Sequence, residues 1–224
     1  MSWSDQIWAL SGEAFGSILG LPFVRELSEG TLALEKFERY LCQDEIYLGN
    51  YSRQLYEFAS LIEDPSQKSF FEVFARAGME SEKQMHALLG SRFGFDVTGN
   101  CKASAITLAY NSHTLRAIRS GSKELGLASL IPCMWIYNKV GLHILQSARL
   151  EDNPYREWIE EYGDPEYTRG VGEVLHMADS WAERADQGTR QAMTDLYLEG
   201  LRLEYAFWDY GYRGEEGDYS YLNI

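Results

Sequence analysis

Apolar residues recur along most of the chain at spacings of three and four, the pattern of helices that bury one face. Glycine, proline and polar residues interrupt the pattern, for example at Gly20-Leu21-Pro22 and Asp64-Pro65. No stretch alternates convincingly with period two, so no strand is predicted. We expect one all-α domain over residues 1–224, a bundle of about seven or eight helices. An acidic, glycine-rich segment at 213–224 is predicted to be a loosely held tail.

The interruptions also set the expected helix boundaries. Ser66 is predicted to cap the third helix, and the residues around Gly99-Asn100 to form a loop. The helices are expected at 7–19, from near 31 to a point before Asp64-Pro65, from 66 to near 90, 104–120, 125–145, after Asn153-Pro154, after Asp164-Pro165, and 188–212.

The longest apolar run, Leu125–Leu145, is long enough for a buried helix and contains Pro132 and Cys133. Because proline lacks a backbone N–H and clashes with the preceding turn, the helix should start or kink there. Tyr137 follows Cys133 at i+4, so thiol and phenol share one face. A buried structural cysteine is the alternative reading of Cys133. The polar residues inside the run, such as Lys139, favour a core helix over a membrane span.

Charge and cysteine usage limit the partners and the compartment. The formal net charge of −14 argues against nucleic acid, which requires a basic face. The three cysteines lie far apart without zinc-like spacing, and the N-terminus resembles no signal peptide, which together indicate a reducing cytoplasm. Cys42 and Cys101 are read as structural.

Two acidic residues lie on apolar helical faces. Asp44 shares a face with Tyr47 and Tyr51, where a carboxylate must be paired or protonated; a structural role for it is equally open. Glu204 lies near Phe207 and Trp208, a setting that raises a carboxyl pKa toward that of a general acid. An exposed Glu204, paired with a nearby arginine, is the alternative.

A metal site is the weaker interpretation. Glu173-x-x-His176 matches one unit of a helical carboxylate diiron site, but such sites use two units, and Glu82–His86 has the wrong spacing. We therefore expect no metal. The roles of His86, His113 and His176 stay open, with core or surface positions favoured.

Four stretches together resemble the TenA family (thiaminase II, aminopyrimidine aminohydrolase), in the family's order and over almost the whole chain. They are Phe37-Glu38-Arg39-Tyr40-Leu41-Cys42-Gln43-Asp44-Glu45-Ile46-Tyr47-Leu48, Leu130-Ile131-Pro132-Cys133-Met134-Trp135-Ile136-Tyr137, Tyr155-Arg156-Glu157-Trp158-Ile159-Glu160-Glu161-Tyr162 and Glu204-Tyr205-Ala206-Phe207-Trp208-Asp209-Tyr210-Gly211-Tyr212. The resemblance implies a haem-oxygenase-like helical bundle.

The resemblance also implies a role for each site residue. Cys133 would be the nucleophile, Glu204 the acid/base at the pyrimidine, and Asp44 the ligand of the pyrimidine amino group. Four tyrosines would stack on the ring or bond near the thiol: Tyr47, Tyr110, Tyr137 and Tyr162. The residues after Tyr110 depart from the family's pattern, as does Gly211, where alanine is usual.

The implied activity is hydrolysis of 4-amino-5-aminomethyl-2-methylpyrimidine, and of thiamin as an alternative substrate, in thiamin salvage. No cofactor or membrane is expected, the partner is a small pyrimidine, and the assembly is a homo-oligomer, a tetramer by resemblance. A nucleophilic thiolate requires a lowered Cys133 pKa. The competing readings are an oxidase or oxygenase on the same bundle and a pyrimidine-binding regulator without turnover.

Overall fold

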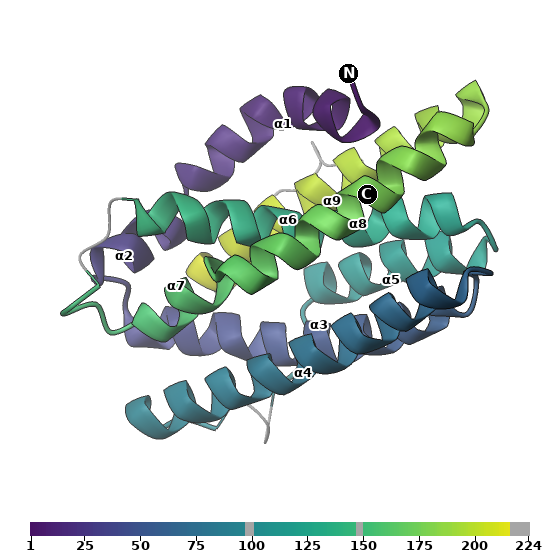
Figure 1. Ribbon diagram of the computed structural model, residues 1–224. Helices are drawn as coiled ribbons and strands as arrows, with labels where there is room; N and C mark the ends of the chain where they lie inside the picture. Colours follow the sequence, from purple (N-terminus) through teal and green to yellow (C-terminus); the bar gives the residue numbers. More distant parts are fainter. Residues whose placement is uncertain (97–100, 147–149, 216–224) are drawn as a thin grey trace.

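A computed structural model describes residues 1–96, 101–146 and 150–215, and within these ranges it contains nine α-helices and no strand (Figure 1). The all-α prediction is confirmed. The predicted loop at Gly99-Asn100 and most of the predicted tail, 216–224, lie outside the described residues. The helices are α1 (Trp3–Leu19), α2 (Pro22–Glu29), α3 (Leu34–Ala59), α4 (Pro65–Phe93), α5 (Ala105–Arg119), α6 (Lys123–Leu145), α7 (Arg156–Tyr162), α8 (Pro165–Arg184) and α9 (Gln187–Arg213).

Helices α6 and α9 form the centre of the bundle, with α3 and α4 packed side by side along one flank (Figure 1). The two central helices approach closely at Gly200, where an added Cβ would lie 2.6 Å from Cγ of Pro132. That distance is too short for any side chain, so the glycine lets the proline turn of α6 nest against α9. The residue after this proline is Cys133, so this contact positions the turn of α6 that carries the thiol.

The sequence patterns missed α2. Gly20-Leu21-Pro22 was expected only to end a helix, but Pro22 also begins the next one, at the first helical position where its missing N–H costs nothing. Helices α1 and α2 are bent by 64° at this break. A second boundary differs as well: Asp64 caps α4 in place of the predicted Ser66, accepting hydrogen bonds from the backbone of Ser66 and Gln67.

Helix α6 does not start at Pro132, because the proline lies inside a helix that begins at Lys123. Tyrosine hydroxyls satisfy two carbonyls near it: Tyr51 donates to Leu130 O at 2.9 Å and Tyr167 donates to Met134 O at 3.0 Å.

Helix α6 has the length and composition of a membrane span, but 83% of its most apolar window is buried inside the protein. The buried position agrees with the predicted core helix.

Cys42 on α3 and Cys101 form a disulfide, whereas the number and wide spacing of the cysteines predicted a reducing compartment. The spacing gave no sign of the pairing because the two cysteines are 59 positions apart in the sequence and the whole of α4 lies between them, which returns the chain to α3. The paired cysteines remove one argument for a reducing compartment. A cytoplasmic location stays a prediction. Cys133 is a free cysteine.

Candidate functional site

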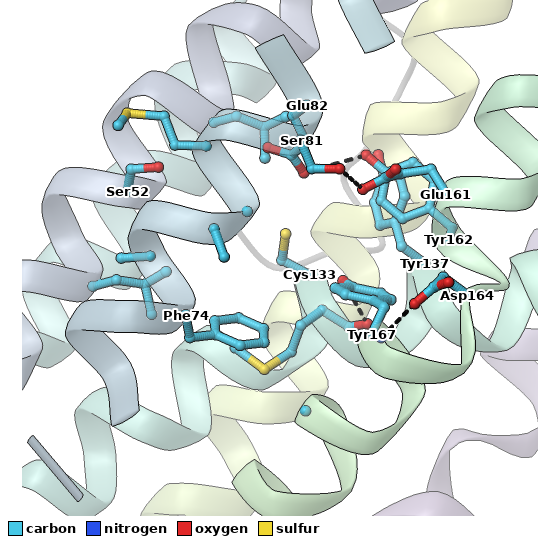
Figure 2. A pocket seen from close by; sticks show the side chains of 18 of the residues that line it. Ser52, Phe74, Ser81, Glu82, Cys133, Tyr137, Glu161, Tyr162, Asp164 and Tyr167 are labelled. Carbon is cyan, nitrogen blue, oxygen red and sulfur yellow. Dashed lines mark hydrogen bonds between the residues drawn. The ribbon is translucent and has the colours of Figure 1, made fainter. Parts of the chain in front are cut away.

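A cavity of about 880 Å³ opens beside Cys133, between α3, α4, α6, α7 and α8. Figure 2 shows the Cys133 side chain pointing into this space, with Glu82 and Ser81 of α4 on one side and Tyr137 and Tyr162 on another. Of the predicted site residues, Cys133, Asp44, Tyr137 and Tyr162 line the cavity. The other three, Glu204, Tyr47 and Tyr110, are buried outside its lining.

The Cys133 thiol lies in a dry and acidic setting. Its residue is 7% exposed, and burial raises its pKa well above the usual value, with the charges of Glu204 and Glu82 acting in the same direction. Tyr47 opposes the rise but does not reverse it. The predicted lowering of the Cys133 pKa is therefore wrong, and the thiol holds its proton at neutral pH.

Glu204 is buried, at 1% exposure, and Tyr110 donates a hydrogen bond to its Oε1 at 2.6 Å. Its second oxygen, Oε2, is buried without a hydrogen-bond partner. Burial raises the pKa of Glu204 to about 8, although the bond from Tyr110 lowers it. Glu204 therefore holds a proton at neutral pH, and the alternative of an exposed glutamate is wrong.

Tyr110 and Tyr47 pack against each other with ring centroids 4.7 Å apart, and Tyr47 also stacks on Tyr51. These rings come from α5 and α3 and lie next to Cys133 and Glu204, whose charges raise the pKa of both Tyr47 and Tyr110 after burial. The structure thus shows Tyr110 hydrogen-bonded to Glu204, the residue predicted to be the acid.

Asp44 is paired with a histidine that sequence reasoning left open. His86 Nε2 lies 3.2 Å from Asp44 Oδ2, and His86 Nδ1 lies 2.7 Å from Glu45 Oε2. Burial lowers the pKa of His86, but hydrogen bonds to the two carboxylates outweigh it and raise the pKa to about 10. Burial raises the pKa of Asp44, and the bond with His86 opposes the rise. We assign an imidazolium between two carboxylates.

Tyr137 and Tyr162 form an aromatic wall of the cavity, with centroids 4.8 Å apart. Tyr137 also stacks on Trp208, and the hydroxyls of Tyr40 and Tyr137 lie 3.2 Å apart. The Tyr162 hydroxyl donates to Glu82 Oε1 at 3.5 Å. These contacts hold both rings beside the thiol.

The remaining histidines lie away from the thiol. His113 is buried and its Nε2 lies 3.1 Å from the carbonyl of Leu196, while His176 is exposed on α8. The Glu173–His176 pair gains no further ligands, since residues 1–96, 101–146 and 150–215 contain no group of three or more potential metal ligands.

Comparisons with known proteins point to one family. The sequence model of the TENA/THI-4/PQQC family matches residues 19–214. The aminopyrimidine aminohydrolase of Halalkalibacterium halodurans is 29% identical over 89% of this chain and 90% of its own length. The enzyme of the same name from Bacillus subtilis is 27% identical over 96% and 92%. The chain also matches 27% of the length of the multifunctional thiamine biosynthesis protein ThiED of Corynebacterium efficiens.

Solved structures agree with these matches. The TenA homologue of P. horikoshii superposes with a TM-score of 0.86 at 28% identity, covering 96% of this chain and 100% of the other. A Shewanella denitrificans domain with a heme oxygenase-like fold superposes with a TM-score of 0.71 at 16% identity, over 94% and 90% of the two chains, and supports the fold alone. The chain belongs to the TENA/THI-4/PQQC family and has the heme oxygenase-like fold.

Proposed function

We propose that the chain is an aminopyrimidine aminohydrolase, a hydrolase acting on C–N bonds, with Cys133 as the nucleophile. The observation that carries the proposal is a free thiol lining a cavity, together with a buried carboxyl at Glu204 that is protonated at neutral pH and whose charge, once ionised, raises the pKa of that thiol. The curated relatives named aminopyrimidine aminohydrolase support the same reaction. The substrate is 4-amino-5-aminomethyl-2-methylpyrimidine, and thiamin is an alternative substrate.

Substrate binding uses the aromatic wall and Asp44. The pyrimidine ring packs beside Tyr137 and Tyr162, which line the cavity on the same side as the thiol. The Asp44 carboxylate accepts a hydrogen bond from the exocyclic 4-amino group, and His86 holds that carboxylate in place from the opposite side. A buried carboxylate held in this way discriminates an amino group from a keto oxygen.

Addition to the ring requires two proton movements. Glu204, protonated below a pKa of about 8, gives its proton to a ring nitrogen as the Cys133 sulfur bonds to a ring carbon. The thiol proton passes to Glu204, which is thereby restored. This relay explains how a thiol with a raised pKa acts as a nucleophile without a resting thiolate.

The adduct then breaks the C–N bond at the exocyclic methylene, and the electron pair stays on the departing nitrogen. Water adds to the methylene to give the hydroxymethyl product, and the sulfur leaves the ring and recovers its proton. The overall change for the aminomethylpyrimidine is consumption of one water and release of ammonia, without a metal or organic cofactor.

The proposal also covers location and assembly. The chain acts in the cytoplasm as one domain over 1–224, within a homotetramer in thiamin salvage.

The test is hydrolysis of the aminomethylpyrimidine and of thiamin by the wild type, Cys133→Ser and Ser129→Ala. Ser129 lies one turn earlier on α6, is buried, and donates only to the carbonyl of Gly126, so it controls for packing changes in this helix. The proposal expects wild-type turnover, at least a roughly thousandfold loss in Cys133→Ser, and activity close to wild type in Ser129→Ala.

Two results would contradict different parts of the proposal. Turnover that survives in Cys133→Ser removes the nucleophile and leaves the reaction to carboxylates. No wild-type turnover of either compound rejects the hydrolase activity itself.

A further inference from the structure

The cavity wall is strongly acidic. Seven carboxylates line it, and within the described part of the chain Arg169 is the one lysine or arginine among the lining residues. The carboxylates are Asp44, Glu82, Glu157, Glu160, Glu161, Asp164 and Glu166.

Six of the seven are engaged elsewhere. Asp44 is paired with His86, Asp164 caps α8, and Ser81 donates to Glu161 at 2.5 Å. The other three form ion pairs with arginines: Glu157 with Arg92, Glu160 with Arg156, and Glu166 with Arg169. These side chains are held by charge-assisted or capping bonds, so they contribute to the field of the cavity more than to direct contacts.

Glu82 differs from them. Within residues 1–96, 101–146 and 150–215 its one hydrogen bond is the 3.5 Å contact from the Tyr162 hydroxyl, which is at the outer limit for such a bond. After burial and Glu204, its charge contributes most to raising the pKa of Cys133. Figure 2 shows Glu82 on α4 across the open space from the Cys133 side chain.

The two carboxylates that raise the pKa of the thiol most, ahead of Asp44, therefore lie in different places. Glu204 is outside the cavity lining, held by Tyr110, whereas Glu82 is on the cavity wall. In the proposed mechanism Glu204 protonates the ring from its packed side and the leaving substituent projects into the open cavity, where Glu82 is the carboxylate with spare bonding capacity.

We infer, on the basis of the proposed function, that Glu82 is a further catalytic residue, which binds the departing amine and keeps it protonated until its C–N bond breaks. One proton is shared between the Glu82 carboxylate and the amine nitrogen. When it lies on nitrogen, the group leaves as ammonia and takes the electron pair of the C–N bond. A neutral amine without this proton would have to leave as an amide anion, which is a very poor leaving group.

The two substrates differ in their leaving groups. In thiamin the leaving nitrogen is already a cationic ring nitrogen without a hydrogen, and it accepts the electron pair directly to give a neutral thiazole. Thiamin therefore needs Cys133 and Glu204 but no proton from Glu82. Burial raises the pKa of Glu82 well above its usual value, with Asp44 and Glu161 adding to the rise and His86 opposing it. Such a group exchanges a proton readily with an amine.

The test compares kcat on both substrates for the wild type, Glu82→Gln and Glu161→Gln. Glutamine keeps an acceptor for Tyr162 but cannot hold the proton. Glu161→Gln is the matched control, since it removes one negative charge from the same wall. We expect Glu82→Gln to lower kcat on the aminomethylpyrimidine about 100-fold and to affect thiamin far less, so that the ratio of the two rates changes. Glu161→Gln should leave the ratio close to wild type.

Equal losses on both substrates, or no change in the ratio, would overturn the role of Glu82. Glu82→Asp should recover part of the lost amine activity, which a merely structural role does not predict. A binding measurement separates this inference from the proposed function. In Cys133→Ser, calorimetry should find that the aminomethyl compound binds more tightly than the neutral hydroxymethyl compound. The double variant Cys133→Ser/Glu82→Gln should bind the two compounds equally. No wild-type turnover would reject the hydrolase, while equal binding of the two compounds would reject Glu82 as the amine ligand.

Discussion

The two sides of Cys133 differ in how tightly their residues are packed and in how open they are to a ligand. On the inner side, Glu204, Tyr110 and Tyr47 are fully packed, and one oxygen of Glu204 has no partner. On the outer side, a cavity of about 880 Å³ carries a wall of carboxylates, most of them tied to arginines or helix caps. The inner side suits proton transfer to a ring held in one place, and the outer side suits a leaving group that varies in size and charge.

The largest effect is expected at Glu204. Glutamine at this position cannot supply the proton, so Glu204→Gln should lower kcat/KM on both substrates by about a thousandfold. Glu199→Gln is the control, because Glu199 lies on the same helix and pairs with Arg116 away from the thiol. A comparable loss in both variants would show that charge removal from α9, not proton donation, is responsible.

The same variant should also change how the free energy of unfolding depends on pH. The pKa of Glu204 is about 8 in the folded protein and near 4.5 when exposed, so the folded state binds the extra proton between these values. Wild-type stability must then fall as the pH rises from 4.5 to 8, by up to about 1.4 kcal/mol per pH unit from this group. Denaturant unfolding should find Glu204→Gln less sensitive to pH in that window, and an unchanged pH dependence would contradict the buried neutral acid.

The next effect concerns the support of Asp44. His86→Gln removes the imidazolium that neutralises two carboxylates, and we expect the free energy of unfolding at pH 6 to fall by about 3 kcal/mol. The pKa of His86 is raised from 6.5 to about 10, so its contribution is complete below 6.5 and is lost as the pH rises through 10. The deficit of the variant should shrink accordingly. His143→Gln, at an exposed site on α6, is the control.

A smaller effect tests the contact that positions the thiol. Gly200→Ala should cost about 1–3 kcal/mol, because the new methyl meets Pro132 and pushes α6 away from α9. At Gly172 on α8 an added Cβ meets nothing within 4 Å, so Gly172→Ala should gain about 0.5–1 kcal/mol from helix propensity. Equal effects of the two substitutions in thermal unfolding would contradict the close approach.

The smallest effect is expected at Tyr110. Its hydrogen bond lowers the pKa of Glu204, so Tyr110→Phe should raise that pKa above about 8. Thiamin hydrolysis should fall as the pH rises through the pKa of Glu204, and in the variant this alkaline limb should move to higher pH by up to about one unit. A shift to lower pH would show that Tyr110 does not stabilise the charged form of Glu204.

The fold followed from the sequence because long helices repeat the spacing of three and four over many turns, as α3 and α6 do. Helix α2 was missed because Pro22–Glu29 is too short to separate from the break before it. The site was harder to predict. The resemblance supplied the predicted roles of Cys133, Glu204 and Asp44, and those roles remain proposals, but the raised pKa of Cys133 depends on burial and on carboxylates from α4 and α9 that no local pattern brings together.

His86 and Glu82 were missed for the same reason. Their spacing on α4 was judged only against a metal motif, whereas their partners, Asp44 and Tyr162, come from α3 and α7. The useful signal was the spacing of four between an acidic residue and a histidine, which places both on one helical face. What that face meets is decided by tertiary packing.

The central claim is that Glu204 protonates the ring and Glu82 protonates the leaving amine. The most direct test is the ratio of kcat on the aminomethylpyrimidine to kcat on thiamin, measured for the wild type, Glu204→Gln and Glu82→Gln. The account predicts that Glu204→Gln lowers both rates and leaves their ratio within about threefold of wild type, while Glu82→Gln lowers the ratio about 100-fold. A ratio that changes equally in both variants, or that changes only in Glu204→Gln, would contradict it.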